Sequence, residues 1–414
     1  MTNMPKKRAV CMIICFMFLV GGCTSILSSG LVARSAVSQL SAKVNQSDTV
    51  TISKEEYQKL LRFQKMSDML DIINENFYID FNVDNVINGA IKGLLFGLED
   101  PYTYYYTPED FAKMWEDDKG EYAGIGIQIL TSPETLQCSV SRVFKNAPAE
   151  HAGIMRGDIL VKVEDIIVDA YTLQDAVDIM RGKVGEPVNV RIQRNDEVID
   201  FVIVRAIVKV NRVEYTMLDS VTGYIILYEF AGDSGVAFKK AMDELIDKGA
   251  KSLIVDLRDN PGGWVKDAET IANLFLDKGI FYYLQYRNGE KEYTYTGNGS
   301  LDIKLAILMN EHSASSSEIL AGALQDRGRA IIVGTQSFGK GVIQQVLSFP
   351  DDGSGMQYTS AQYFTPDGNK VHGVGITPDY EVNMPDEDKT RIFELGDMTD
   401  TQLRTAYEII NGLH

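Results

Sequence analysis

The chain has 414 residues, a length that accommodates two or three domains. Apolar residues make up 45% and charged residues 24% of it, which is ordinary for a globular protein. The formal net charge of −18 argues against a nucleic-acid partner, because nucleic-acid binding needs a basic surface.

The N-terminus combines a basic cluster with an apolar run. Residues 6–8 are Lys-Lys-Arg, and the apolar stretch after them weakens towards residue 33. This order predicts a membrane anchor over residues 1–33 with its basic end in the cytoplasm. The alternatives are a bacterial lipoprotein signal, in which Cys23 of residues 20–23 (Val-Gly-Gly-Cys) is lipidated, or a cleaved secretory signal. All these readings place the folded part of the chain outside the cytoplasm.

Cysteine usage limits the chemistry of the folded part. Cys11, Cys15 and Cys23 lie in the N-terminal segment, which leaves Cys138 as the one cysteine beyond it. A single cysteine forms neither an intrachain disulfide nor a thiolate metal site. No metal is implied by any other motif of the chain.

A helical region follows a polar linker over residues 34–52. Ser53 and Glu56 have the spacing of a capping box, which predicts the start of a helix. A second helix is expected over residues 83–97, and the Asp-Pro pair at 100–101 breaks the pattern. The first helical segment bears an apolar stripe: Tyr57, Leu60, Leu61, Met66, Met69, Leu70 and Ile73.

The pattern after these helices is typical of a peptide-binding module. Ile125, Gly126 and Ile127 fit a loop whose backbone N–H groups bind a terminal carboxylate, and residues 147–153 fit a later turn. A helix starting at Leu173 is expected to form the other wall of a peptide groove. In this order, the segments resemble a PDZ domain, in which an extended peptide adds to the edge of a sheet.

The next part of the chain alternates strands and helices. Residues 223–228 and 252–256 predict strands, and residues 236–248 between them predict a helix, which indicates an α/β architecture. An Asn-Pro-Gly-Gly turn at residues 260–263 follows the second strand. One further helix is expected over residues 401–410.

A serine cluster lies where a strand is expected to turn into a helix. Residues 313–318 read Ser-Ala-Ser-Ser-Ser-Glu, after the apolar run 305–309 and before apolar residues at helical spacing. Backbone N–H groups at the start of a helix are unpaired and favour negative charge. A serine there is placed to attack a carbonyl carbon while backbone donors hold the developing oxyanion.

A lysine in the sequence Phe-Gly-Lys-Gly, residues 338–341, supplies the base that such a serine needs. Histidine is the usual base, but lysine can act when burial favours its neutral amine. Lys340 lies among glycines and apolar residues, which favours burial. Because positions 340, 342 and 344 share one face of the expected strand 342–346, Gln344 is placed to orient the amine.

These motifs, in this order, resemble the carboxyl-terminal processing proteases, also called tail-specific proteases. That family typically has Ser-Ala-Ser-Ala-Ser-Glu, then Phe-Gly-Lys-Gly, and then a glutamine four residues after the lysine. The resemblance implies that Ser315 is the nucleophile, Lys340 the general base and Gln344 the support of that base. It spans nearly all of the chain from about residue 55.

The same resemblance implies where the oxyanion is held. The family's Leu-Arg-x-Asn-Pro-Gly-Gly motif matches residues 257–263 and gives one backbone donor, Gly262 or Gly263, between which the sequence does not choose. The second implied donor is the N–H of Ser316. Ser316 replaces the family's usual alanine and His312 its usual glycine, so a second hydroxyl adjoins the nucleophile and His312 is a minor alternative base.

The leading hypothesis is an extracytoplasmic, membrane-anchored serine endopeptidase that cleaves proteins near their C-termini after the PDZ domain binds the tail. It needs no cofactor, its partners are protein or peptide tails and the membrane, and the N-terminal helical region either packs on the protease or forms a homodimer contact. The alternatives are an inactive PDZ-containing scaffold and a crotonase-like enzyme acting on acyl thioesters.

The expected fold class is an α/β serine protease core of the crotonase/ClpP-like type, with a PDZ domain and an N-terminal helical region behind the anchor. The expected domain limits are residues 1–33 for the anchor or signal, 34–118 for the linker and helical region, 119–207 for the PDZ domain, 208–386 for the peptidase core and 387–414 for a C-terminal helical tail.

Overall fold

The computed structural model describes residues 51–131, 135–297, 299, 301–385, 388, 391 and 393–413, without the side chain of Asp117. The expected membrane anchor and nearly all of the expected linker lie outside these residues. The described residues divide into two units, one ending at Glu99 and the other beginning at Asp100. Among the helices described, none is both long enough and apolar enough to cross a membrane.

The first unit contains three helices: α2 (Lys54–Leu61), α3 (Gln64–Asn76) and α4 (Val83–Phe96). The predicted capping box is present, because Glu56 N donates to Ser53 Oγ at 3.1 Å and Ser53 N donates to Glu56 Oε2 at 2.8 Å. Asn82 caps α4 by accepting from the N–H groups of Asp84 and Asn85. None of the residues in these helices is buried.

The PDZ region of the second unit is built on one antiparallel sheet, with strand order β3-β4-β5-β7-β8 and β6 paired with β5. Its strands are β3 (Ile127–Thr131), β4 (Cys138–Val143), β5 (Ile159–Val163), β6 (Ile166–Ile167), β7 (Pro187–Arg194) and β8 (Glu197–Val204). Two helices, α6 (Pro148–Ala152) and α7 (Leu173–Met180), accompany it. A separate pair, β2 (Glu121–Gly124) with β9 (Ala206–Lys209), carries the chain into and out of this region.

The peptidase region contains a six-stranded sheet with order β10-β11-β12-β15-β16-β19, parallel from β11 onwards. Its strands are β10 (Val213–Met217), β11 (Thr222–Leu227), β12 (Ser252–Asp256), β15 (Lys304–Met309), β16 (Ile331–Gly334) and β19 (Tyr380–Glu381). The predicted strands at 223–228, 252–256 and 305–309 are therefore confirmed. Both faces of this sheet are buried, which explains why its strands read as continuous apolar runs.

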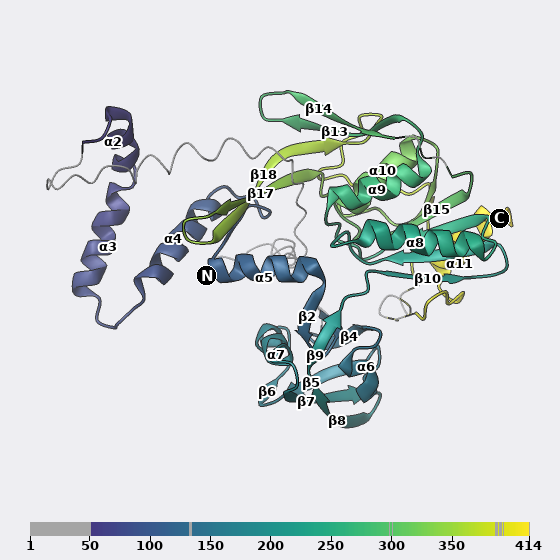
Figure 1. Ribbon diagram of the computed structural model, residues 1–414, viewed down its shortest axis with the longest axis horizontal. Coiled ribbons are helices and arrows are strands. Elements are labelled where there is room, and N and C mark those ends of the chain that lie inside the picture. Colours follow the sequence, from purple (N-terminus) through teal and green to yellow (C-terminus); the bar gives the residue numbers. More distant parts are fainter. Residues whose placement is uncertain are drawn as a thin grey trace. The chain divides into compact units, whose positions relative to one another are not determined.

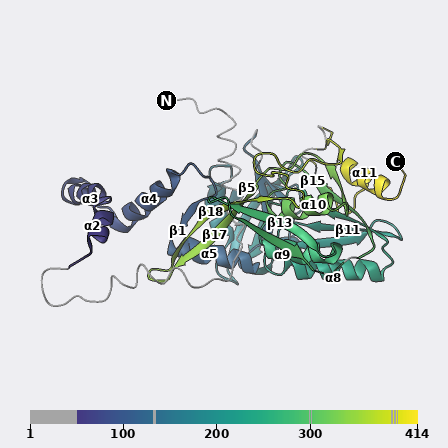
Figure 2. The same ribbon diagram turned by 90° about the horizontal axis from the view of Figure 1, so that it is seen from above.

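Helices cover both faces of the parallel sheet. On one face lie α8 (Ser234–Asp247), α9 (Val265–Phe275) and α10 (Ser316–Asp326), and on the other lies α11 (Thr401–Ile410). Figure 1 shows α8, α9 and α10 close together, and Figure 2 shows α8 and α11 on opposite sides of the strands. Side chains alternate between the two layers: Ile225, Val255 and Ile307 face the three helices, whereas Tyr224, Ile254 and Leu308 face α11.

A second, antiparallel sheet completes the peptidase region, with order β1-β18-β13-β14 and β17 paired with β18. Its strands are β1 (Tyr104–Tyr106), β13 (Gly279–Tyr286), β14 (Lys291–Thr296), β17 (Val342–Phe349) and β18 (Ser354–Phe364). Through β1, the residues just after Asp100 join this sheet, and α5 (Pro108–Lys119) follows them.

Candidate active site

The serine cluster lies at the junction between β15 and α10, as the sequence predicts. Ser315 is the N-cap residue of α10, and its side chain is completely buried. Its backbone has φ 56° and ψ −115°, a conformation that costs a residue other than glycine about 1–3 kcal/mol. Such strain is typical of a nucleophile held at the turn between a strand and a helix.

The other serines of the cluster bind the loop that follows β12. Ser313 Oγ donates to Leu257 O at 2.8 Å, Ser316 Oγ to Gly263 O at 2.7 Å, and Ser317 Oγ to Asn260 O at 3.0 Å. These hydroxyls are buried, so each bond satisfies two polar atoms that water does not reach. The cluster and the loop are therefore held together along their length.

Glu318 connects the serine to the lysine through hydrogen bonds to its buried carboxylate. Its Oε2 accepts from Ser315 N at 2.8 Å and from Lys340 N at 2.9 Å. Its Oε1 accepts from Ser337 Oγ at 2.5 Å and from Gly339 N at 2.7 Å. Burial raises the pKa of Glu318, and these four hydrogen bonds oppose that rise. One carboxylate thus fixes the two backbones that bring Ser315 and Lys340 together.

The Lys340 side chain is half-buried and its Nζ lies 4.7 Å from the centroid of the Tyr102 ring. Gln344 is completely buried on β17, and its Nε2 donates to Thr359 Oγ1 at 3.3 Å. Gln344 Oε1 has no hydrogen-bond partner among the described residues. The amine of Lys340 is therefore not bonded to the glutamine oxygen in this arrangement.

The Asn-Pro-Gly-Gly turn packs directly against the serine. Gly262 has φ +98°, and a Cβ on it would lie 2.8 Å from the Cβ of Ser315, so only glycine fits. The N–H of Gly262 donates to Asn260 Oδ1 at 2.9 Å. Because that donor is engaged, Gly262 is less suited than Gly263 to donate a further backbone hydrogen bond.

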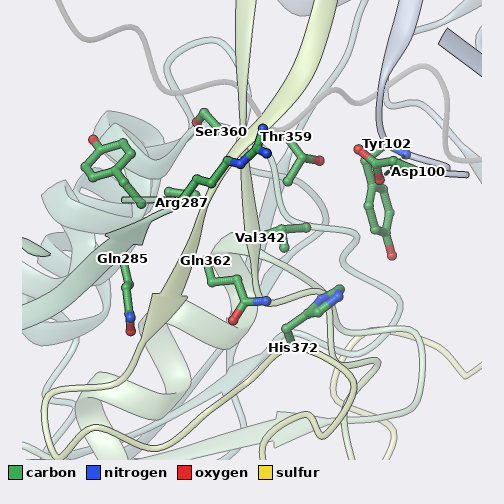
Figure 3. A pocket seen from close by; sticks show the side chains of 11 residues that line it. Asp100, Tyr102, Gln285, Arg287, Val342, Thr359, Ser360, Gln362 and His372 are labelled. Carbon is green, nitrogen blue, oxygen red and sulfur yellow. Dashed lines mark hydrogen bonds between the residues drawn. The ribbon is translucent and has the colours of Figure 1, made fainter. Parts of the chain in front are cut away.

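A cavity of about 460 Å³ is lined in part by Tyr102, whose ring lies against Lys340 Nζ (Figure 3 shows the lining residues). Figure 3 shows Asp100 and Tyr102 along one side of it and Gln285 and Arg287 along the other. Two of its lining residues touch the base region directly, since Tyr102 faces Lys340 Nζ and Thr359 bonds to Gln344. The cavity is therefore a place where a substrate segment can reach the site.

The three predicted PDZ residues lie at and just before the start of β3. Gly126 has φ +87°, and Ile125 is buried, with its carbonyl accepting from Ala149 N at 2.8 Å. Ile127 begins β3, which pairs on one side only, with β4. Among the described residues, no strand pairs with the other edge of β3, the kind of edge to which an extended peptide can add.

His312 lies on the surface beside Glu311. Its side chain is 42% exposed, and its Nε2 lies 4.0 Å from Glu311 Oε1 on the surface. The arrangement therefore favours Lys340 over His312 as the base.

Sequence reasoning missed the roles of Glu318 and Tyr102. Glu318 had a signal, because Ser-Ser-Ser-Glu at residues 315–318 has the S-x-x-E spacing of a capping box, and its carboxylate does accept from Ser315 N. Tyr102 had none, since it lies 238 positions before Lys340 and only tertiary packing brings the two together.

Family models match three parts of the chain. The model for peptidase family S41 matches residues 221–382, that for a PDZ domain matches residues 139–194, and that for the activating protease CtpB N-terminal domain matches residues 24–109. These parts coincide with the peptidase region, the PDZ sheet and the N-terminal helices. Together they define a serine-type peptidase that contains a PDZ domain.

Relatives are similar over most of their length. A probable CtpA-like serine protease of Staphylococcus aureus is 35% identical over 343 residues, which cover 80% of this chain and 68% of the relative. A protein of the same description from Staphylococcus epidermidis is 35% identical over 326 residues, 78% of this chain and 66% of the relative. The chain therefore belongs to peptidase family S41.

A solved structure supports the same relationship. The photosystem II D1 C-terminal processing protease superposes with a TM-score of 0.54 at 26% identity, covering 80% of this chain and 94% of that protein. A putative S41 protease from Bacteroides fragilis superposes with a TM-score of 0.55 at 15% identity, over 77% of this chain and 88% of that one, which shows the shared fold alone.

Proposed function

We propose that the chain is an endopeptidase with a Ser-Lys dyad that cleaves proteins near their C-termini. The observation that carries this proposal is the shared Glu318 oxygen, which binds the backbone N–H of both Ser315 and Lys340. The neighbouring serines add support, because Ser313, Ser316 and Ser317 donate their hydroxyl protons to backbone carbonyls. We assign Ser315, the N-cap residue of α10, as the nucleophile of the cluster.

In the proposed reaction, Ser315 Oγ attacks the carbonyl carbon of the scissile peptide while the neutral amine of Lys340 accepts its proton. The lysine then returns the proton to the leaving amine, and water hydrolyses the acyl-enzyme by the same route. The N–H groups of Gly263 and Ser316 hold the oxyanion, a role that Gly262 cannot share while its N–H binds Asn260. Gln344 Oε1 accepts from the Lys340 amine in the reacting arrangement.

Recognition of a protein tail is assigned to the PDZ domain. The tail would add as a strand to the open edge of β3, with its carboxylate at the backbone N–H groups of residues 125–127. The name of the D1 C-terminal processing protease, which describes that protein, fits cleavage near a C-terminus.

We also propose the type of the peptidase core, its domain limits and the location of the protein. We assign the peptidase core to the crotonase/ClpP-like type on its parallel sheet with helices on both faces. The proposed domain limits are those expected from the sequence. In addition, β1, which lies inside residues 34–118, pairs with β18 of the core. An extracytoplasmic location with an anchor at residues 1–33 follows from the sequence alone, and a homodimer through α2–α4 fits their exposed apolar side chains.

Single and double variants of the dyad test the mechanism. Ser315→Ala and Lys340→Ala are each expected to lower turnover of an unfolded protein substrate by roughly 100- to 10,000-fold. The double variant should be little worse, because the two residues act as one unit. Ser316→Ala keeps its backbone N–H and is the matched control, which should retain most activity.

The pH profile separates lysine from histidine as the base. Because a lysine base acts only when neutral, activity should rise with pH. The rise should persist in His312→Ala, and its loss there would identify His312 as the base. Activity that survives in Ser315→Ala but not in Ser316→Ala would overturn the choice of nucleophile.

A further inference from the structure

The contact between Lys340 and Tyr102 places a cation on the face of an aromatic ring. The Nζ lies 4.7 Å from the ring centroid, inside the roughly 6 Å range in which the ring's negative face attracts a cation. This attraction exists only for the protonated lysine. A neutral amine, which is the form that acts as a base, loses it.

The alternative partner of the lysine is the unpaired oxygen of Gln344. Gln344 is completely buried, and its Oε1 lacks a hydrogen bond to any residue that the structure describes. A buried acceptor without a partner is costly, so a donor that reaches it is strongly favoured. Lys340 is four residues away, just before the strand that carries Gln344.

The backbone of Lys340 has little freedom, so its side chain alone selects between these partners. Glu318 binds the N–H groups of Gly339 and Lys340 at 2.7 and 2.9 Å. On the next residue, a Cβ at Gly341 would lie 2.1 Å from His372 N, so the chain is closely packed there. Rotation of the lysine side chain, with the loop fixed, is the motion that would carry Nζ from Tyr102 towards Gln344.

Several other charged or titratable groups lie near the lysine or near Tyr102. Glu318 accepts hydrogen bonds from the backbone N–H groups of both Ser315 and Lys340. Asp100, Arg287 and His372 line the same cavity as Tyr102. Asp100 accepts from Tyr102 N at 3.2 Å and from Thr103 Oγ1 at 2.6 Å, and burial lowers the pKa of His372.

We propose that Tyr102 is a positioning residue that holds protonated Lys340 in a resting place away from Gln344. The proposal rests on the assignment of Lys340 as the base. Tyr102 then competes with Gln344 for the lysine, and the competition sets the pH at which the base becomes available. The ring, not the hydroxyl, carries this effect.

Tyr102→Leu and Tyr102→Phe form a matched pair for the test. Both keep the backbone bonds of residue 102, including the one from Gln357 Nε2 to its carbonyl at 3.0 Å. The pH dependence of kcat/KM is measured for wild type and both variants. Tyr102→Leu should move the acidic limb to lower pH by about one unit, the scale of a partly desolvated contact between a cation and a ring. Tyr102→Phe keeps the ring and should keep the limb at its wild-type position.

An unmoved limb in a folded Tyr102→Leu protein overturns the proposal, and so does a limb that moves equally in both variants. A second readout is the rate at which an acetylating reagent modifies Lys340 as pH varies, followed by mass spectrometry. The Leu variant should react faster than wild type at low pH, and an equal rate counts against the proposal. If Lys340→Ala remains active, the assignment of the base fails, whereas the acetylation rate still reports on Tyr102.

Discussion

At the scale of single residues, Glu318 joins the two halves of the site. Its two oxygens accept four hydrogen bonds, from Ser315, Ser337, Gly339 and Lys340, and every donor is a backbone N–H or a hydroxyl. A carboxylate suits this place because both of its oxygens only accept. The neutral isostere glutamine turns one of them into a donor.

Glu318→Gln should therefore lower kcat. Its amide NH₂ would face two donors, and each N–H left without an acceptor costs about 1–3 kcal/mol. If one such cost is added entirely to the activation free energy, turnover falls roughly 5- to 150-fold. Steady-state kinetics measure this, with Ser317→Ala as a control that removes one buried hydrogen bond of the same cluster without touching Glu318. Unchanged kcat would show that the clamp does not align the dyad.

The raised pKa of Glu318 also predicts that the free energy of unfolding depends on pH, and Glu318→Gln tests this. Burial raises the pKa of Glu318 in the folded state above its unfolded value. The folded protein then binds this proton more tightly, so stability falls as pH rises from the ordinary glutamate range through the raised value. The free energy of unfolding of wild type relative to Glu318→Gln should fall over that window. Urea denaturation at several pH values measures it, and a difference that rises with pH contradicts the assignment.

At the scale of elements, α5 links β2, where the chain enters the PDZ region, to the Asn-Pro-Gly-Gly turn at residues 260–263. Trp115 of α5 stacks on Trp264 with ring centroids 6.0 Å apart and an interplanar angle of 16°. Trp264 Nε1 also donates to Asp118 Oδ1 near the end of the helix. Since Trp264 directly follows Gly263, the helix holds the proposed oxyanion donor in place.

Trp264→Phe should lower kcat more than it changes KM, because a displaced oxyanion donor weakens binding of the transition state only. Complete loss of such a donor costs about 100- to 1,000-fold, so a partial displacement is expected to cost roughly 3- to 30-fold. Kinetics on a peptide substrate separate the two constants. Lys113→Ala, on the exposed side of α5, is the control and should behave as wild type. A change confined to KM would assign Trp264 to substrate binding.

The end of α7 makes a similar aromatic contact with the strand pair β2 and β9, through which the chain enters and leaves the PDZ region. Arg181 is the C-cap residue of α7, and its guanidinium centre lies 4.8 Å from the centroid of the Tyr122 ring on β2. A cation at a helix C-terminus is favoured by the helix dipole in any case. The ring contact adds a link between the groove helix and the strand pair that leads to the peptidase core.

Arg181→Ala is therefore expected to lower turnover of a tailed substrate severalfold, while the isolated PDZ domain binds the tail with unchanged affinity. Measuring both quantities on one peptide decides the matter. Lys183→Ala, an exposed residue two positions on, provides the matched control. Equal turnover in wild type and Arg181→Ala would leave Arg181 as an ordinary cation at a helix end.

At the scale of the whole molecule, the PDZ domain contacts the peptidase core directly, in addition to the connection through β2 and β9. Arg142 of β4 binds Glu214 of β10 at 2.9 Å, and its guanidinium centre lies 3.6 Å from the centroid of the Tyr228 ring. Arg142 is nearly buried, so the contact is little screened by solvent. A tail that favours one arrangement of the domains can then act on catalysis, provided that it binds the two arrangements with different affinity.

A free tail peptide should therefore activate cleavage of a short substrate that lacks a tail. The expected rise is about 5- to 150-fold at saturation, the usual range of coupling between two sites. The same peptide with an amidated C-terminus should have no effect, because the amide removes the carboxylate that the loop at residues 125–127 is proposed to bind. Inhibition by the free peptide would instead indicate competition at the active site.

The sequence by itself determined the α/β class, the peptide-binding module and the order of the motifs. Its periodicities identified β12, α11 and the junction at Ser315, because those elements follow local patterns of apolar residues. The sequence did not predict that β1 joins the core sheet, since its partner strand β18 lies about 250 residues later. Pairing of distant strands depends on tertiary packing and not on local propensity.

Within the site, the chemical types were readable and their partners were not. The spacing of the motifs predicts the serine, lysine and glutamine, whereas the bond from Gly262 N to Asn260, on which the proposal of Gly263 depends, is visible only in the folded chain. The placement of Lys340 over Tyr102 likewise emerged only from the folded chain. The physical reason is the same in both cases: residue type and spacing are local properties, while hydrogen-bond and ring partners are set by the approach of segments far apart in the sequence.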